Sequence, residues 1–334
     1  MKRVNIVFTL LSVFVFIACL ETKHSQTIIK NGILKANLYL PDNENGYYVS
    51  TRFDWSGIIS SLEYEGHTYY GKWFNEKDPT QVAIMGPVEA YSPLNFNDVK
   101  IGNEFVKIGI GALKKNSEEE YNPFKSYTIV DPGTWTITKK TDAVEFIHIL
   151  NTDNISYEYT KSVQLIKDEA KMVITHCLKN TGKQSIKTEV FNHNFFVIDD
   201  QTIGKDFELI FPTNVYCADK GRGIGDIFEI QGRKIRFNRD MQEEESIACR
   251  YLEGICNSVK DFDIRIENLR TGAGVRISGD HALSRLRLWG NSKTVCPETY
   301  LNLSIDSSDE FRWSYYYEFY EIDAKNDSFA KVLE

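Results

Sequence analysis

Residues 312–319 read RWSYYYEF, and this stretch decides the fold class. Every second residue from Trp313 to Phe319 is aromatic, and most of the residues between them are polar. Alternation with a period of two is the pattern of a β-strand that buries one face. Similar alternation occurs over 171–178 and 285–288, and residues 135–138 and 144–150 read as a hairpin. No segment shows the 3.6-residue period of a long helix.

Turn residues separate these strands along the chain. Gly, Asn, Asp and Pro gather at 131–133, 180–183 and 270–274. No Pro/Gly/Ser-rich linker and no internal repeat divides the sequence. The chain has 334 residues, and all-β sandwiches of more than 200 residues often form one unit. We therefore expect an all-β protein, a single large antiparallel β-sandwich over residues 31–330.

Composition and charge indicate which classes of molecule the protein is expected to bind. The chain is 42% hydrophobic and 26% charged, which is ordinary for a globular protein. Asp and Glu number 47 against 39 Lys and Arg, which gives a net charge of −8. Binding to nucleic acid depends on clustered cations that neutralise phosphates, so we expect no nucleic-acid partner. Aromatic residues make up 13%, and exposed aromatic faces suit sugar rings.

The N-terminus reads as a targeting signal. Lys2 and Arg3 precede an apolar run over 6–18 that ends at Cys19. The run is shorter than the roughly 20 residues of a membrane span and fits a secretory signal. FIAC at 16–19 resembles a bacterial lipobox. The resemblance implies a signal peptide over 1–18, a lipid on Cys19, a tether over 19–30 and a place in the bacterial cell envelope, periplasmic or surface-exposed. Plain secretion after cleavage by another peptidase is the alternative.

The remaining cysteines and acidic pairs give no clear site. Cys249 and Cys256 are spaced wrongly for most zinc sites, and a disulfide between them is possible but not required. We expect no catalytic metal. An acidic loop such as 199–200 leaves a structural calcium ion open.

His193 is the histidine whose surroundings suggest chemistry. It lies in FNHNFF at 191–196, after an apparent strand over 189–191. Aromatic neighbours can shield an imidazole and move its pKa. His148 and His176 lie inside strand patterns, so we expect structural roles for both. A structural role for His193 is the alternative from the residues alone.

Glu298 differs from the other acidic residues. It follows Cys296 and Pro297 at the predicted end of one strand and precedes another over 300–305. A carboxyl group held there, partly out of water, can serve as a base. An exposed loop position is the alternative, because Glu is mostly exposed.

Together, these motifs resemble those of the galactose mutarotase-like (aldose 1-epimerase) superfamily. NHNFF at 192–196 resembles the Asn-His-x-Tyr/Phe-Phe motif that carries the family's catalytic His. WG at 289–290 followed by VCPE at 295–298 resembles the segment of its catalytic Glu. Residues 51–59 resemble an opening strand that ends in a Gly turn. Residues 106–111 resemble the segment that carries a cationic sugar-contacting residue. The second His of galactose-acting members has no counterpart here.

The resemblance implies a function and a set of site residues. His193 is the acid at the ring oxygen of an aldose, and Glu298 is the base at its anomeric hydroxyl. Arg52 and Lys107 contact sugar hydroxyls or a substrate carboxylate. The reaction needs no cofactor and no metal. The partners are a monosaccharide or the sugar end of an oligosaccharide, and a membrane reached through the N-terminal lipid.

Two other functions compete with an aldose mutarotase. A non-catalytic carbohydrate-binding lipoprotein on the same fold is the first alternative. A carbohydrate-cleaving enzyme ranks last, because cleavage usually needs two carboxylates in one site and only Glu298 stands out.

Overall fold

The computed structural model describes residues 24–74, 83–153 and 155–322. Their regular secondary structure is β-strand apart from one short 3-10 helix at Val259–Asp261, so the predicted all-β class is confirmed. Within the described ranges, no helix is long and apolar enough to cross a membrane.

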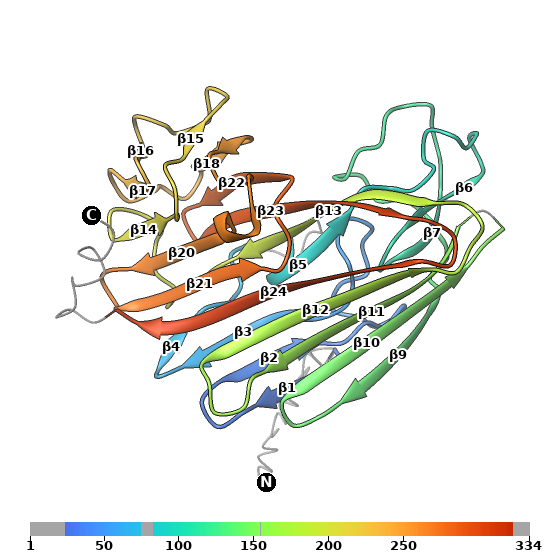
Figure 1. The fold of residues 1–334 in the computed structure, drawn as a ribbon, viewed down its shortest axis with the longest axis horizontal. Helices are drawn as coiled ribbons and strands as arrows, with labels where there is room; N and C mark the ends of the chain where they lie inside the picture. The colour runs from blue at the N-terminus through green and yellow to red at the C-terminus, as the bar shows by residue number, and fades with distance from the viewer. Residues whose placement is uncertain (1–23, 75–82, 154, 323–334) are drawn as a thin grey trace, which may run out of the picture.

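The largest sheet has ten antiparallel strands, whose long central members lie side by side in Figure 1. In spatial order they are β16 (Phe228–Gln231), β17 (Lys234–Phe237), β14 (Phe207–Ile210), β20 (Asp263–Asn268), β21 (Ala273–Gly279), β24 (Glu310–Glu321), β12 (Lys171–Asn180), β11 (Ser156–Leu165), β10 (Ala143–Asn151) and β9 (Thr134–Lys139). The RWSYYYEF stretch lies in β24 and buries Trp313, Tyr315, Tyr317 and Phe319. The predicted hairpin is β9 and β10.

Two further sheets form the second layer, and they meet where β3 contacts β5. The five-stranded sheet has the order β18 (Ser246–Cys249), β22 (Arg285–Asn291), β23 (Thr294–Ile305), β13 (Ile186–Phe195) and β5 (Gly86–Tyr91). The four-stranded sheet consists of β1 (Gln26–Lys30), β2 (Lys35–Tyr39), β3 (Ile58–Tyr64) and β4 (His67–Thr68).

Two small sheets complete the fold. They are β6 (Glu104–Lys107), β7 (Gly111–Lys114) and β8 (Ile129–Asp131), and the pair β15 (Tyr216–Cys217) and β19 (Leu252–Glu253).

One apolar core joins the two layers. It contains Ile174 of β12, Val190 of β13, Leu301 of β23 and Leu62 of β3, all buried. Contact between the inner faces of large antiparallel sheets defines a β-sandwich, as predicted. A second cluster includes Phe105 of β6 and Phe195 of β13, so it packs on the opposite, outer face of the five-stranded sheet.

Two predicted boundaries are wrong. The tether does not extend to residue 30, because Gln26–Lys30 pairs with β2 and buries Ile29 in the core. Residues 51–57 form a loop rather than a strand, and β3 begins at Ile58. Gly57 has φ +69°, and a Cβ there would lie 3.1 Å from Cε of Lys161. The predicted signal peptide and Cys19 lie outside the described residues.

Candidate active site

The two faces of β13 carry different kinds of residue. Asn192 and Asn194 are fully buried on the side of the sandwich core, where they bond with Tyr317 of β24. Because side chains alternate along a strand, Phe191, His193 and Phe195 point to the outer face. His193 therefore lies within β13. The sequence suggested a shorter strand that ends before His193, and that suggestion is wrong.

One row of side chains crosses the outer face of the five-stranded sheet. Arg287 of β22 pairs in register with Glu298 of β23, and Glu298 pairs with His193 of β13. His193 in turn faces Val88 of β5. Residues opposite one another on adjacent strands share a face and lie close together. Glu298 thus lies inside β23, between a guanidinium and an imidazole, and the exposed-loop alternative is wrong.

His193 and Glu298 are in direct contact. His193 Nε2 lies 3.4 Å from Glu298 Oε1, and the two side chains are only 4% and 3% exposed. Nδ1 of His193 is buried and has no hydrogen-bond partner among the described residues. A buried polar atom without a partner is costly. The catalytic role of the pair stays a prediction.

Aromatic rings enclose the imidazole. Phe195 stacks on His193 with ring centroids 3.8 Å apart, and Trp289 and Phe53 approach edge-on at 5.9 Å each. Trp73 stacks on Phe195 in turn, at 5.0 Å. Trp73 and Trp289 are half-buried.

The surroundings shift the pKa values of His193 and Glu298 in the directions that favour the neutral form of each group. Burial, with smaller contributions from Arg52 and Arg287, holds the pKa of His193 well below its usual range. Burial raises the pKa of Glu298, while Arg287, Tyr300 and Arg52 act in the opposite direction. Both shifts therefore favour the uncharged form of each group across the 3.4 Å contact. Groups perturbed in this way are typical of functional sites.

Tyr300 and Arg287 hold the carboxyl group of Glu298. The Tyr300 hydroxyl donates a hydrogen bond of 2.8 Å to Oε2, and Nε of Arg287 lies 3.7 Å from Oε1. Tyr300 and Arg287 lie on the same face as Glu298 because they are two residues away on β23 and directly opposite on β22. Neither residue was among the predicted site residues, although the alternation in 285–288 placed Arg287 on a polar face.

Arg52 lies near the pair, as predicted for a substrate contact. Its guanidinium carbon is 4.5 Å from the ring centres of both Phe53 and Phe124. It lies close enough to lower the pKa values of both His193 and Glu298. Contact with a sugar stays a prediction.

Lys107 is placed differently from the prediction. It is 2% exposed, and its ammonium donates to the carbonyl oxygens of Arg52 and Tyr91 and to the Tyr121 hydroxyl. Three acceptors occupy the three hydrogens of an ammonium group. Burial and, to a smaller extent, Arg52 lower the pKa of Lys107 to about 7. This geometry gives Lys107 a supporting role under the Arg52 loop.

A buried ionic network lies behind the pair, on the inner face of the sheet. The Lys161 ammonium contacts the carboxylates of Glu89 and Asp54, and all three side chains have no exposed surface. His176 Nε2 lies 3.1 Å from Glu89 Oε1, and Asn192 donates a 2.7 Å hydrogen bond to the same oxygen. The network therefore fixes the strand that carries His193.

The predicted structural histidines are buried in strands. Besides His176 with its contact to Glu89, His148 Nε2 lies 2.8 Å from the Pro132 carbonyl oxygen and Nδ1 lies 3.0 Å from the Tyr157 hydroxyl. Both histidines are therefore buried within strands, and their structural roles stay a prediction.

Comparisons with known proteins agree with this architecture. No protein-family model matches the sequence, and no curated protein matches it. Among solved structures, a galactose mutarotase-like protein from Clostridium acetobutylicum superposes with a TM-score of 0.54 at 13% identity, covering 90% of this chain and 96% of that one. A galactose mutarotase related enzyme from Lactobacillus acidophilus gives 0.54 at 12% identity, covering 90% and 99%. An aldose epimerase homologue from C. elegans gives 0.51 at 12% identity, covering 90% and 100%.

The fold is that of the galactose mutarotase-like proteins. At these identities the likeness concerns the fold, and function has to be argued from the site.

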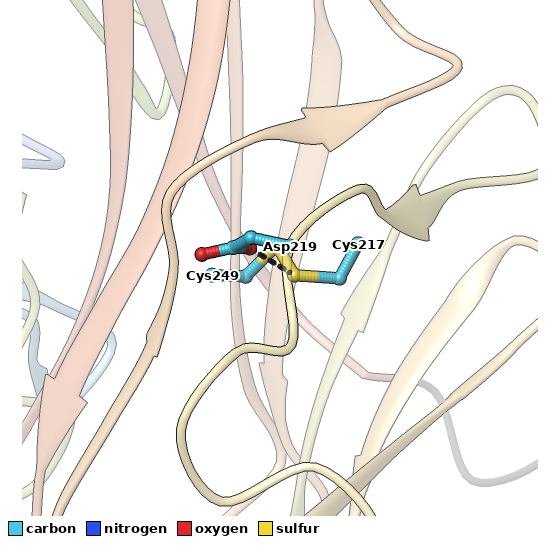
Figure 2. Close-up of side chains that lie close together, drawn as sticks. All are labelled: Cys217, Asp219 and Cys249. Carbon is cyan, nitrogen blue, oxygen red and sulfur yellow. Dashed lines mark hydrogen bonds between the residues drawn. A yellow bond between two sulfur atoms is a disulfide. The ribbon is translucent and has the colours of Figure 1, made fainter.

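On this galactose mutarotase-like fold, the described residues contain one group of potential metal ligands, which Figure 2 shows. Cys217, Asp219 and Cys249 bring their ligand atoms within 4.8 Å of one another. The two cysteines form a disulfide, so neither sulfur is a thiolate ligand. The possible Cys249–Cys256 bridge is therefore wrong, since Cys249 pairs with Cys217 and Cys256 is free. In the acidic loop at 199–200, the Asp199 carboxylate accepts a hydrogen bond from Thr68 N and lies 2.9 Å from His67 Nδ1.

Proposed function

We propose that the protein is an aldose mutarotase that interconverts the α and β anomers of a sugar by acid–base catalysis. The observation that carries the proposal is the His193–Glu298 contact at 3.4 Å on one face of the sheet, with Nδ1 of His193 buried and without a partner. The galactose mutarotase-like fold supports the same reading by analogy.

The reaction needs two groups that share one proton. Ring opening requires a proton at the ring oxygen and the loss of one from the anomeric hydroxyl. One of the two groups, His193 or Glu298, donates while the other accepts. After rotation of the open-chain aldehyde, the proton returns along the opposite route and closes the ring as the other anomer. No proton is gained or lost over the cycle.

The two pKa shifts suit this exchange. The pKa of Glu298 is shifted upward and the pKa of His193 downward, so the two pKa values move toward one another. A proton shared by two groups with converging pKa values can move in either direction, which a reversible isomerisation requires. The acid role of His193, which the family resemblance implies, requires that the proton be on His193 when the sugar ring opens.

Exchange spectroscopy on a panel of aldoses tests the proposal. We expect the protein to accelerate anomer exchange, and we expect His193→Ala and Glu298→Gln each to lower the rate by about 10²–10⁴-fold. His281→Asn and Glu310→Gln are matched controls, because both side chains are partly exposed and lie outside the row. No acceleration for any aldose would refute the mutarotase, and binding without exchange would support the carbohydrate-binding alternative.

A further part of the proposal concerns location. We infer a lipid-anchored protein of the bacterial cell envelope, from the signal over 1–18 and from Cys19. The Cys217–Cys249 disulfide supports a compartment outside the cytoplasm, because such bonds persist mainly in oxidising surroundings.

A further inference from the structure

Guanidinium groups gather beside the His193–Glu298 pair in a chain whose net charge is −8. Arg285 and Arg287 project from β22 on the outer face, and Arg52 approaches from the loop before β3. Arg287 is the member that touches Glu298, with Nε at 3.7 Å.

Arg285 already has a protein partner. Its Nη2 donates a 2.9 Å hydrogen bond to Glu189 Oε1, and its guanidinium carbon lies 3.9 Å from the Tyr300 ring centre. The charge of Arg285 is therefore compensated within the sheet, by an ion pair and by a cation–π contact.

Arg287 differs from Arg285 in its contacts with the protein. Within the described residues its guanidinium makes no hydrogen bond, its Nε is buried without a hydrogen-bond partner, and its one ion-pair contact is Glu298. The side chain is 34% exposed, so the other guanidinium nitrogens can be reached from solvent. Five N–H donors in a planar fork match the oxygens of a carboxylate or a phosphate.

The position of Arg287 in the row indicates which part of a bound sugar its guanidinium would contact. Strands lie about 4.8 Å apart, so the backbones of Arg287 and His193 are roughly 10 Å apart, with Glu298 between them. A sugar that places its anomeric centre at Glu298 and His193 can extend toward β22 or toward β5. Val88 offers only methyl groups on the β5 side, whereas Arg287 offers hydrogen-bond donors on the β22 side.

We propose that the site takes an aldose with an acidic substituent, a hexuronic acid or a sugar phosphate, and that Arg287 binds the anionic group. This inference rests on the proposed function and names its substrate class.

The electrostatics of the pair support the proposal. Arg52 and Arg287 help to hold the pKa of His193 low. An anion beside Arg287 offsets that charge and raises the pKa of His193, which favours the imidazolium that donates to the ring oxygen. A neutral aldose makes no such change.

The test compares acidic aldoses with their neutral parents on the purified full-length chain. Anomer exchange is measured for glucuronic acid, galacturonic acid, glucose 6-phosphate, glucose and galactose, and binding is measured by calorimetry. We expect kcat/KM for at least one acid to exceed that of its parent by about 10- to 100-fold, the range of one charge-assisted contact. The uronic acids and the phosphate distinguish a carboxylate from a phosphate ligand.

Variants separate anion binding from a simple effect on Glu298. We expect Arg287→Gln to lower the acid-to-neutral ratio of kcat/KM by about 10- to 100-fold, and we expect Arg287→Lys, which keeps the charge but lacks the planar fork, to retain only part of that ratio. Arg312→Gln is the matched control, because Arg312 lies on β24 and is 70% exposed. Thermal melting establishes that each variant is folded.

The results of these experiments distinguish failure of the anion-binding inference from failure of the proposed mutarotase activity. Equal kcat/KM for acids and parents, or an equal loss for both in Arg287→Gln, would overturn the inference while leaving the mutarotase intact. Tight binding of an acid that depends on Arg287, without anomer exchange, would keep the inference and refute the enzyme.

Discussion

Replacing Lys161 by Met tests the buried network behind the active site. The substitution keeps most of the side-chain volume but removes the ammonium between Glu89 and Asp54, which have no exposed surface. It also leaves the Ser56 carbonyl oxygen without its 2.9 Å hydrogen bond from Nζ. Two buried carboxyl groups then lack their cation.

The expected loss follows from the burial of both partners. Removing one partner of a buried ion pair costs about 3–5 kcal/mol of the free energy of unfolding. Lys35→Met is the matched control, because Lys35 pairs with Glu63 at 3.1 Å with the side chains 51% and 47% exposed. An exposed pair contributes only about 0–1 kcal/mol.

The pH dependence supplies a second, independent expectation. In the wild type, burial alone would raise the pKa of Glu89, but Lys161 and His176 lower it to about 2. The Glu89 contribution to stability is therefore present above its ordinary pKa of 4.5 and is lost as the pH falls toward 2. Without Lys161 the carboxyl pKa values rise, so the folded variant binds protons and gains stability as the pH falls. We expect the gap between wild type and Lys161→Met to be wider at pH 7.5 than at pH 5.

Urea unfolding followed by tryptophan fluorescence measures these free energies at both pH values. Equal losses for Lys161→Met and Lys35→Met would refute the reasoning, since burial would then carry no cost. A gap that does not change with pH would contradict the expectation that the carboxyl pKa values rise in the variant enough for it to bind protons between pH 7.5 and pH 5.

Three further predictions concern the site, the disulfide and the anchor. Tyr300→Phe removes the hydrogen bond to Glu298 and so raises the pKa of that carboxyl group. We expect the alkaline limb of the kcat/KM profile to move to higher pH, whereas Tyr316→Phe, on an exposed β24 position, leaves it in place. The double variant Cys217→Ser/Cys249→Ser opens a bridge between residues 32 apart in sequence, and we expect a loss of roughly 3–4 kcal/mol in unfolding free energy, against a small change for Cys177→Ser. Non-reducing peptide mapping should recover the Cys217–Cys249 link, and a Cys249–Cys256 link would contradict the structure. Cys19→Ser should release the protein from the membrane fraction of the native host, and retention there would argue against a lipid on Cys19.

Much of the fold could be predicted from the sequence because long strands such as β24 and β12 are amphipathic. The alternation in β24 and β12 placed aromatic and aliphatic residues inside, and both strands lie as expected in the ten-stranded sheet. Short strands were harder to recognise. Gln26–Lys30 has a single buried side chain, Ile29, so its pattern could not be distinguished from that of a tether.

The candidate site was only partly predictable. His193 and Glu298 were found through local motifs, but the sequence gives no strand register, and the register is what places Arg287 beside Glu298. Lys107 was misjudged for a related reason. Lysine is normally exposed, and only the packed structure reveals the three acceptors that surround its ammonium.

The alternation along β13 has a practical consequence for redesign. Its odd-numbered positions near His193 lie on the outer face, while Asn192 and Asn194 bond to the interior. A library that randomises Phe191 can therefore alter the outer face without removing the hydrogen bonds of Asn192 and Asn194. Inserting one residue upstream in the strand would do the reverse, since it would turn the imidazole inward and the amides outward.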